Sequence, residues 1–284
     1  MTTEKIPNLG SLKVNQIMGK YIKNHLFVLR TCFFKILSIQ EERWTIIIPL
    51  LYSIVDSCES LLILSQRKKS KDPKVRDCFV ISRTIIETII NIIFILGKGN
   101  SAKENARDHW LQKSYRDLNR EFKIGDQILR KVWTGEIDLD KNPDLKKAFD
   151  KYTVKSGKEN TKWTPESITK RLEFIHTKYG SKVSTGLHFS FFHIYRHASE
   201  IAHGTFFGGM FALGLTGPKN SNDSEKETIL EKRSQLSTIL LMVFLSISSL
   251  FKVIAKELPN KSLAEMDKNI QSSFFKESLW QNMK

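Results

Sequence analysis

Apolar positions along this chain recur every three to four residues almost throughout, which is the spacing of one face of an α-helix. Alternation of apolar and polar residues, the signature of a half-buried strand, is nowhere convincing. The periodic segments, with boundaries good to a few residues, predict helices at 11 to 38, 41 to 67, 74 to 97, 102 to 132, 143 to 152, 165 to 179, 184 to 213, 224 to 257 and 262 to 280.

The pattern predicts the all-α class, as a single bundle of long helices that forms one domain over residues 1 to 284. Two stretches depart from the helical pattern. The polar segment 133 to 164 is broken by Gly135, Pro143 and Gly157 and reads as an excursion, with its mobility left open. A turn-rich loop is expected at 216 to 227.

Three runs, 44 to 64, 85 to 96 and 236 to 251, are apolar on most of the helix circumference. A membrane span needs about 20 mainly apolar residues. Asp56 and Glu59 interrupt the run at 44 to 64, and Glu87 and Asn91 interrupt the run at 85 to 96, while the run at 236 to 251 is short and contains serines. We therefore expect buried bundle helices without membrane insertion, and a homodimer that helps to cover them.

Lysine and arginine number 45 against 30 acidic residues, a formal net charge of +15. Such an excess favours a polyanionic partner, which means nucleic acid such as RNA or an anionic membrane surface, although it is equally typical of a solubilising surface. Three cysteines, Cys32, Cys58 and Cys78, lie singly in apolar runs without metal-site spacing. They predict small core residues and a reducing cytoplasm. We expect no metal and no cofactor.

One segment concentrates chemically capable side chains on one helix face. His193, Arg196, Glu200 and His203 share a stripe, with Tyr195 and Ser199 beside it. Arg196 and His203 are two turns apart, about 10 Å along the axis. That distance suits one phosphodiester touched by both side chains, because arginine offers a fork of donors to phosphate and histidine exchanges a proton near neutral pH. The alternative is a polar cluster that only stabilises the bundle.

A second polar set interrupts the apolar helix expected at 74 to 97. Arg83, Glu87 and Asn91 recur at every fourth residue. Burying an isolated charge is costly, so such residues pair or lie along a cavity. Arg83 and Glu87 can pair with each other, and they could also orient Arg196 or His203 on a neighbouring helix.

The span from Arg196 through His197 to His203 resembles the Rx4-6H motif of the HEPN superfamily, whose members are helical bundles in bacterial toxins, abortive-infection proteins and CRISPR-associated ribonucleases. The pair "ISRTIIETI" (81 to 89) and "YRHASEIAHG" (195 to 204) is also similar to a group of bacterial proteins known only as a domain of unknown function. This second resemblance covers residues 41 to 257, the first about eight residues.

The HEPN resemblance implies a HEPN-like core and metal-independent RNA cleavage to a 2′,3′-cyclic phosphate, in a toxin or phage-defence effector. By position, Arg196 would hold the scissile phosphate, His203 would activate the 2′-hydroxyl or assist the leaving group, and His197 would take the polar place after the arginine. In that superfamily the site commonly forms between two protomers. This chain departs from it in its extra helices at both ends and in the segment "HGTFFGGMFALG" directly after the motif.

Other local signatures are absent from the sequence: it has no phosphate-binding G-x-x-x-x-G-K-[ST], no G-x-G-x-x-G after a strand, no H-E-x-x-H and no G-x-S-x-G. The glycines at 204 to 214 instead favour a close approach of two helices. Two classes therefore remain, a HEPN-type endoribonuclease and a non-catalytic helical protein that binds RNA or a protein. Exposure of Arg196 and His203 would favour the enzyme, and their burial would favour the binding protein.

Overall fold

The computed structural model describes residues 12–37, 42–65, 74–118, 121–131, 138–214, 225–258 and 261–277. Helices dominate this part of the chain, so the all-α prediction is confirmed. Contacts divide the chain into two compact units, one of residues 1–97 and 168–284 and one of residues 98–167. Compact units of this kind need not fold independently, so the single domain over 1–284 stays a prediction.

The first unit begins with three long helices close to the predicted bounds: α1 (Leu12–Leu37), α2 (Glu42–Ser65) and α3 (Val75–Lys98, whose last residue belongs to the second unit). Asp77 lies in the first turn of α3 and Lys98 in its last turn. These charges oppose the partial charges of the helix ends and so stabilise both termini. Helix α3 is buried along most of its circumference, as its run of isoleucines requires.

The unit continues after residue 168 with shorter helices and two long ones. They are α6 (Ile168–Tyr179), α7 (Ser181–Ser190), the π-helical turn η1 (Phe191–Tyr195), α8 (Arg196–Ala202), α9 (Phe206–Ala212), α10 (Glu225–Glu257) and α11 (Lys261–Glu277). The single helix predicted over 184 to 213 is therefore wrong. The π-turn interrupts it, and Gly204, with a φ of 66°, ends α8. Of the loop predicted at 216 to 227, residues 216–224 lie outside the described residues, and α10 begins at Glu225.

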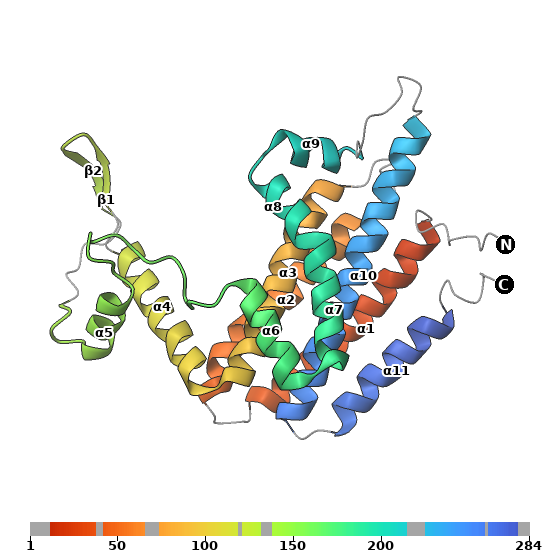
Figure 1. The fold of residues 1–284 in the computed structure, drawn as a ribbon, viewed down its shortest axis with the longest axis horizontal. Coiled ribbons are helices and arrows are strands. Elements are labelled where there is room, and N and C mark those ends of the chain that lie inside the picture. Colours follow the sequence, from red (N-terminus) through yellow and green to blue (C-terminus); the bar gives the residue numbers. More distant parts are fainter. Residues whose placement is uncertain are drawn as a thin grey trace. The chain divides into compact units, whose positions relative to one another are not determined.

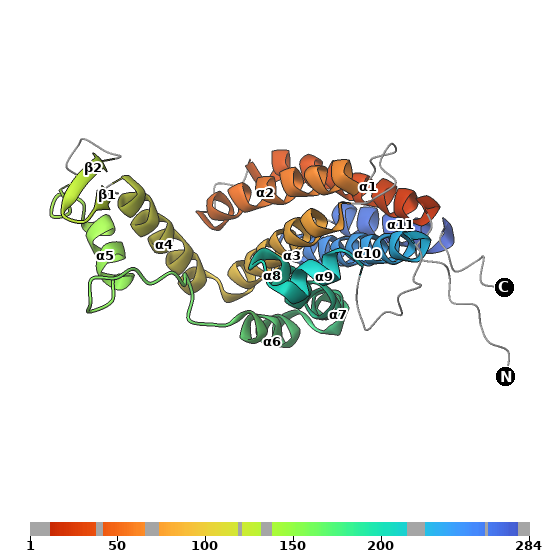
Figure 2. The same cartoon turned by 90° about the horizontal axis from the view of Figure 1, so that it is seen from above.

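The core of this unit lies around α10, which contacts α1 on one side and α7 on another (Figures 1 and 2). Its side chains Phe244, Phe251 and Ile254 are fully buried. Helix α11 packs against both α1 and α10, and α2 packs against α1. Burying a side chain of this size contributes about 1.5–3 kcal/mol, so these α10 residues stabilise the unit through its core.

The second unit contains α4 (Asn100–Leu118), a hairpin of β1 (Glu121–Ile124) and β2 (Gln127–Lys131), and α5 (Pro143–Lys151). The helix predicted over 102 to 132 is therefore wrong in its second half. Gly125 has a φ of 58° and, with Asp126, forms the two-residue turn that antiparallel strands favour. The predicted excursion 133 to 164 is described from residue 138 and contains α5, as expected for 143 to 152.

Polar contacts tie the second unit together. Tyr152 donates its hydroxyl to the carbonyl oxygens of Asn105 (2.9 Å) and Trp163 (2.8 Å). Lys151 forms an ion pair of 2.7 Å with the buried Asp108. Burial, followed by the Asp108 charge, raises the pKa of Tyr152 to about 12. These contacts attach α5 and the segment after it to α4.

Cys32, Cys58 and Cys78 are buried and free, so the core role predicted for them is confirmed. Among the described residues, three helices are long and apolar enough to cross a membrane by length and composition alone. They are Trp44–Ser65, Val75–Lys98 and Glu227–Glu257, with 39%, 61% and 72% of their most apolar windows buried. These buried percentages do not test the expectation of no membrane insertion.

Candidate functional site

The predicted stripe lies on α8 and the π-turn before it. Arg196 is the first residue of α8 and His203 is its C-cap. Both side chains are exposed to solvent. A π-turn is rare in proteins and is found frequently at functional sites, and this one ends directly at Arg196. The two residues on which the sequence interpretation depends are therefore accessible at opposite ends of one short helix.

His203 is held in place by the way α8 ends. Its backbone N–H donates to the Ser199 carbonyl (3.0 Å), and the N–H of Gly204 donates to the Ile201 carbonyl (3.1 Å). Gly204 then turns the chain with a positive φ, which an L side chain rarely adopts. The imidazole is thus presented at the C-terminal end of α8.

Glu200 and Thr205 fix the corner between α8 and α9. Thr205 caps α9 by accepting the Gly208 N–H (3.0 Å), and its hydroxyl donates to the Glu200 carboxylate (2.8 Å). A Cβ atom on Gly208 would lie 2.5 Å from the backbone carbonyl of Glu200. The close helix approach predicted for this glycine segment is therefore confirmed, and Glu200 acts here as a corner residue.

His197 points away from the solvent and into an aromatic cluster. Its ring stacks on Phe211 with a centroid distance of 4.0 Å and an interplanar angle of 2°, and Phe79 and Phe207 lie near it. Its Nδ1 atom is buried without a hydrogen-bond partner. Burial, followed by the charges of Arg196 and His193, lowers the pKa of His197. A neutral His197 therefore packs α8 against α9 and α3.

This lowered pKa predicts a pH-dependent stability. Because the unfolded chain protonates His197 at about its ordinary value of 6.5, and the folded chain does so only at lower pH, stability is complete above that value and falls below it. His197→Phe keeps the ring stacking and lacks the proton. Between about pH 7 and about pH 5 we expect a steeper fall of the thermal midpoint in the native protein than in this variant. Equal slopes by circular dichroism would contradict it.

Arg83 reaches the stripe through Tyr195. Its guanidinium lies over the Tyr195 ring, 4.5 Å from the centroid, and donates to the tyrosine hydroxyl at 3.3 Å. Glu87 approaches the Arg83 Nε at 3.9 Å, so the predicted pair exists as a loose one. In the described part of the chain, no hydrogen bond or ion pair joins either side chain to Arg196 or His203. Arg83 therefore positions the π-turn, one residue before Arg196.

The other predicted residues separate from this centre. Asn91 accepts a hydrogen bond from Arg171 of α6, so it joins α3 to α6 and not to the stripe. The His193 ring lies between Phe189, stacked at 6.2 Å, and Phe192, edge-on at 5.1 Å. Ser199 takes part through its backbone carbonyl, which accepts the His203 N–H.

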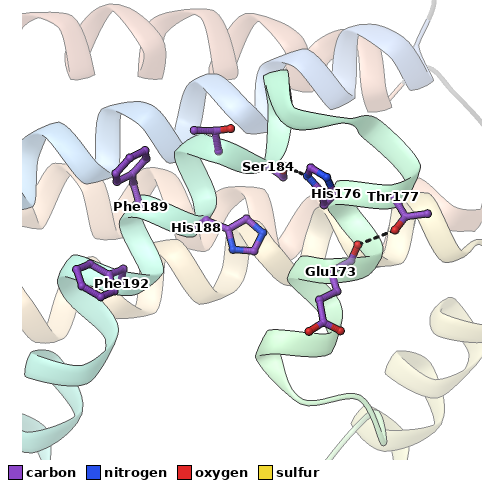
Figure 3. A pocket seen from close by; sticks show the side chains of 8 residues that line it. Glu173, His176, Thr177, Ser184, His188, Phe189 and Phe192 are labelled. Carbon is purple, nitrogen blue, oxygen red and sulfur yellow. Dashed lines mark hydrogen bonds between the residues drawn. The ribbon is translucent and has the colours of Figure 1, made fainter.

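A groove of about 690 Å³ between α6 and α7 was not predicted from the sequence (Figure 3). His176 and Ser184 hydrogen-bond there at 2.8 Å, and His188 lies on the same groove. The lining residues from α6 are Glu173, His176 and Thr177, and those from α7 and η1 are Ser184, Thr185, His188, Phe189 and Phe192. Only the turn at Gly180 brings the two helices together, which explains why spacing within one helix did not group these histidines.

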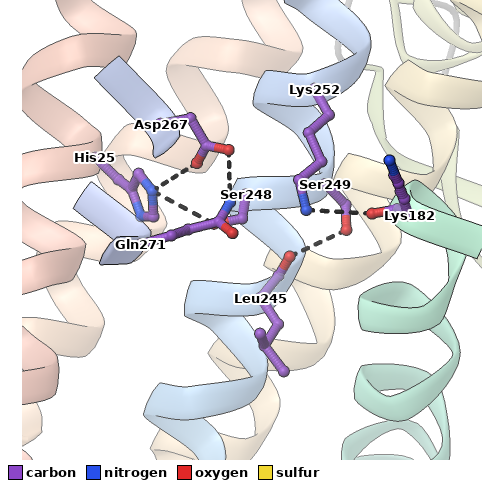
Figure 4. Close-up of polar contacts among 8 residues, drawn as sticks. All are labelled: His25, Lys182, Leu245, Ser248, Ser249, Lys252, Asp267 and Gln271. Atoms are coloured by element: carbon purple, nitrogen blue, oxygen red, sulfur yellow. Dashed lines mark hydrogen bonds and ion pairs between the residues drawn. The ribbon is translucent and has the colours of Figure 1, made fainter. Parts of the chain in front are cut away.

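A second buried cluster joins α1, α10 and α11 (Figure 4). His25 Nε2 lies 3.2 Å from the Asp267 carboxylate and 3.4 Å from the Ser248 hydroxyl. In a serine hydrolase the carboxylate and the serine contact opposite ring nitrogens, whereas here both contact Nε2. The cluster therefore lacks the geometry of a catalytic triad and ties α11 to the core.

In the described part of the chain, no three or more histidine, cysteine, aspartate or glutamate side chains are grouped so as to hold a metal ion. The chemistry available at the stripe is therefore that of an exposed guanidinium, an exposed imidazole and the aromatic rings around them.

The model of a family of unknown function, DUF5677, matches residues 45–235 of the chain. The matched part is more than half of the chain and includes Arg83 on α3 and the whole stripe on α8, while α1 and α11 lie outside it. Comparison with curated proteins and with solved structures gave no significant match.

Proposed function

Because the chain belongs to DUF5677, a family of unknown function, we propose its activity from its own residues: it is a metal-independent endoribonuclease of the HEPN type. The observation that carries this proposal is the exposure of Arg196 and His203 at the two ends of α8. In the described part of the chain, neither side chain is engaged by an ion pair or hydrogen bond. Both remain available to a ligand.

The proposed reaction uses the RNA as its own nucleophile. His203 takes the proton of a 2′-hydroxyl while solvent water protonates the leaving 5′-oxygen, or it protonates the 5′-oxygen while water accepts the 2′-hydroxyl proton. The 2′-oxygen bonds to phosphorus while the bond to the 5′-oxygen breaks, which yields a 2′,3′-cyclic phosphate and a 5′-hydroxyl. Arg196 stabilises the extra negative charge on the phosphorane oxygens with its fork of donors. No metal takes part in these steps.

Charge and assembly support the same proposal. The net charge of +15 attracts RNA through phosphate contacts. Phe206, 84% exposed, and Phe207 lie three and four residues after His203, and large exposed apolar side chains in a group are typical of contact surfaces. We propose that two copies of the chain pair as a homodimer that brings the two α8 stripes to one cleft, and that the protein acts in the cytoplasm as a toxin or phage-defence effector.

A second function, a non-catalytic helical protein that binds RNA or another protein, is favoured by one observation. Most residues around Arg196 and His203 already have structural roles. Glu200 fixes the α8–α9 corner and His197 is stacked on Phe211. A stripe whose other members are packed in this way could be structural as a whole, and activity measurements decide between the two functions.

The deciding experiment incubates the purified full chain with total RNA, with and without a chelator. We expect cleavage by the native protein in both conditions, fragments with 2′,3′-cyclic phosphate ends, and no cleavage by an Arg196→Ala/His203→Ala double variant. Arg76→Ala, an exposed arginine on α3, is the matched control and should cleave normally. Intact RNA with the native protein would favour the binding function, and loss of cleavage in chelator would place the chemistry at a metal.

A further inference from the structure

We propose that the groove between α6 and α7 is a nucleobase-binding site, which holds one unpaired base of the RNA next to the phosphate bound by Arg196. This inference rests on the proposed function, because it identifies what the same site binds beside the scissile phosphate. The groove has a volume of about 690 Å³, which lies within the range of small-ligand sites. A base and its ribose fit in such a volume.

Two phenylalanines supply the flat surface that a base needs. Phe189 and Phe192 line one end of the groove and are 52% and 74% exposed (Figure 3). Exposing two such rings to water is costly for a monomer that does not use them. Nucleobases stack on aromatic side chains irrespective of their sequence, which is how many proteins hold single-stranded nucleic acid.

Hydrogen-bonding groups line the rest of the groove. His176 is held by Ser184, whose hydroxyl lies 2.8 Å from its Nδ1, so the imidazole is fixed with its other nitrogen available to a ligand. His188 and Glu173 add a second imidazole and a carboxylate (Figure 3). Imidazole and carboxylate groups can donate to or accept from the edge of a base. The lining thus combines stacking and edge recognition in one place.

The groove and the stripe are neighbours along the chain and in space. The ring of His193 contacts both Phe189 and Phe192, and Phe192 precedes Arg196 by four residues across the π-turn. A π-turn takes more residues than an α-helical turn. Side chains four residues apart, such as those of Phe192 and Arg196, therefore point to nearly the same side of the helix. A base stacked on Phe192 therefore belongs to a nucleotide adjacent to the phosphate at Arg196.

The chemistry of the lining residues favours a nucleobase over a divalent cation or a free phosphate. Among the described lining residues, Glu173 is the single acidic side chain, too few for a divalent cation. No lysine or arginine is among these lining residues either, so a free phosphate has no strong partner there and the phosphate belongs at Arg196. A nucleobase is a flat aromatic ring with polar edges, so it matches both the phenylalanines and the hydrogen-bonding groups of the lining.

The test measures binding of adenosine, guanosine, cytidine and uridine to the full chain by saturation-transfer NMR, with inorganic phosphate as a separate ligand. We expect at least one nucleoside to bind saturably and Phe192→Ala to weaken it about tenfold or more. Phe192→Leu, which keeps the apolar bulk but loses the aromatic face, should weaken it similarly. Phe27→Ala, at a ring 70% exposed on α1, is the matched control and should bind as the native protein does.

Arg196→Ala separates the inference from the proposed function, because it should retain nucleoside binding while RNA cleavage is lost. Nucleosides that bind while the native protein cleaves no RNA would support the groove and overturn the nuclease. RNA cleavage without nucleoside binding, or equal binding by Phe192→Ala, would overturn the groove and leave the nuclease standing. Binding of phosphate but of no nucleoside would also overturn the groove proposal. A groove that binds a protein segment and no nucleoside would overturn it as well.

Discussion

Replacing Arg196 with alanine is expected to slow RNA cleavage by at least about 100-fold, and replacing His203 with alanine should do the same. The first change removes the donors that stabilise charge on the phosphorane, and the second removes the group that moves the proton. Both side chains are exposed and unengaged within the described chain, so the thermal midpoint should stay nearly unchanged. Single-turnover cleavage of a labelled RNA measures the rate, and circular dichroism measures the fold.

Arg196→Lys refines this prediction. Lysine keeps the positive charge but loses the two-pronged geometry that matches phosphate oxygens. We expect its rate to lie between those of the native protein and Arg196→Ala. An Arg196→Lys rate equal to the native one would argue against a bidentate phosphate contact. Unfolding of His203→Ala would return the stripe to a structural role.

Replacing Asp267 with alanine is expected to lower the free energy of unfolding by about 3 kcal/mol. Its carboxylate is almost fully buried, lies 3.2 Å from His25 Nε2, and accepts the Gln271 side-chain N–H at 2.6 Å. The substitution leaves the fully buried His25 without this partner and opens a space between α1 and α11. For a unit of this size the thermal midpoint should fall by roughly 6–12 °C.

Two variants control for this effect. Asp267→Asn keeps the shape and one acceptor oxygen, and should cost clearly less than Asp267→Ala. Glu265→Ala changes an exposed acidic residue on the same helix, and should stay within about 0.5 kcal/mol of the native protein. Thermal and urea unfolding measure all three. A midpoint for Asp267→Ala equal to the native one would show that α11 is held by its apolar contacts alone.

Helical periodicity predicted most of this fold because each long helix buries one continuous apolar face. The bounds of α1, α2, α3 and α10 fall within a few residues of those predicted. The errors lie where local geometry, not periodicity, decides the structure. Gly125 permits a hairpin turn inside a stretch that reads as helical, and the π-turn at Phe191–Tyr195 preserves the apolar pattern on both sides of itself.

Only the part of the candidate site that lies within one helix could be predicted from the sequence. The spacing of Arg196 and His203 is visible in the sequence, and the burial of His197 among Phe79, Phe207 and Phe211 is not. Contacts between distant segments create the other two clusters. His25 meets Asp267 across 242 positions, and no spacing rule reaches that far. The groove histidines needed the turn at Gly180 to come together.

The π-turn before Arg196 also affects how related sequences should be aligned. Relative to an α-helix it accommodates one additional residue, and each residue turns an α-helix by about 100°. A relative that lacks one residue within 191–195 would carry the same letters after the gap, yet its α8 side chains would point in a different direction relative to α7. Within DUF5677, a gap at this position would thus mark a change in the direction of the Arg/His stripe, and an identity score would not record it.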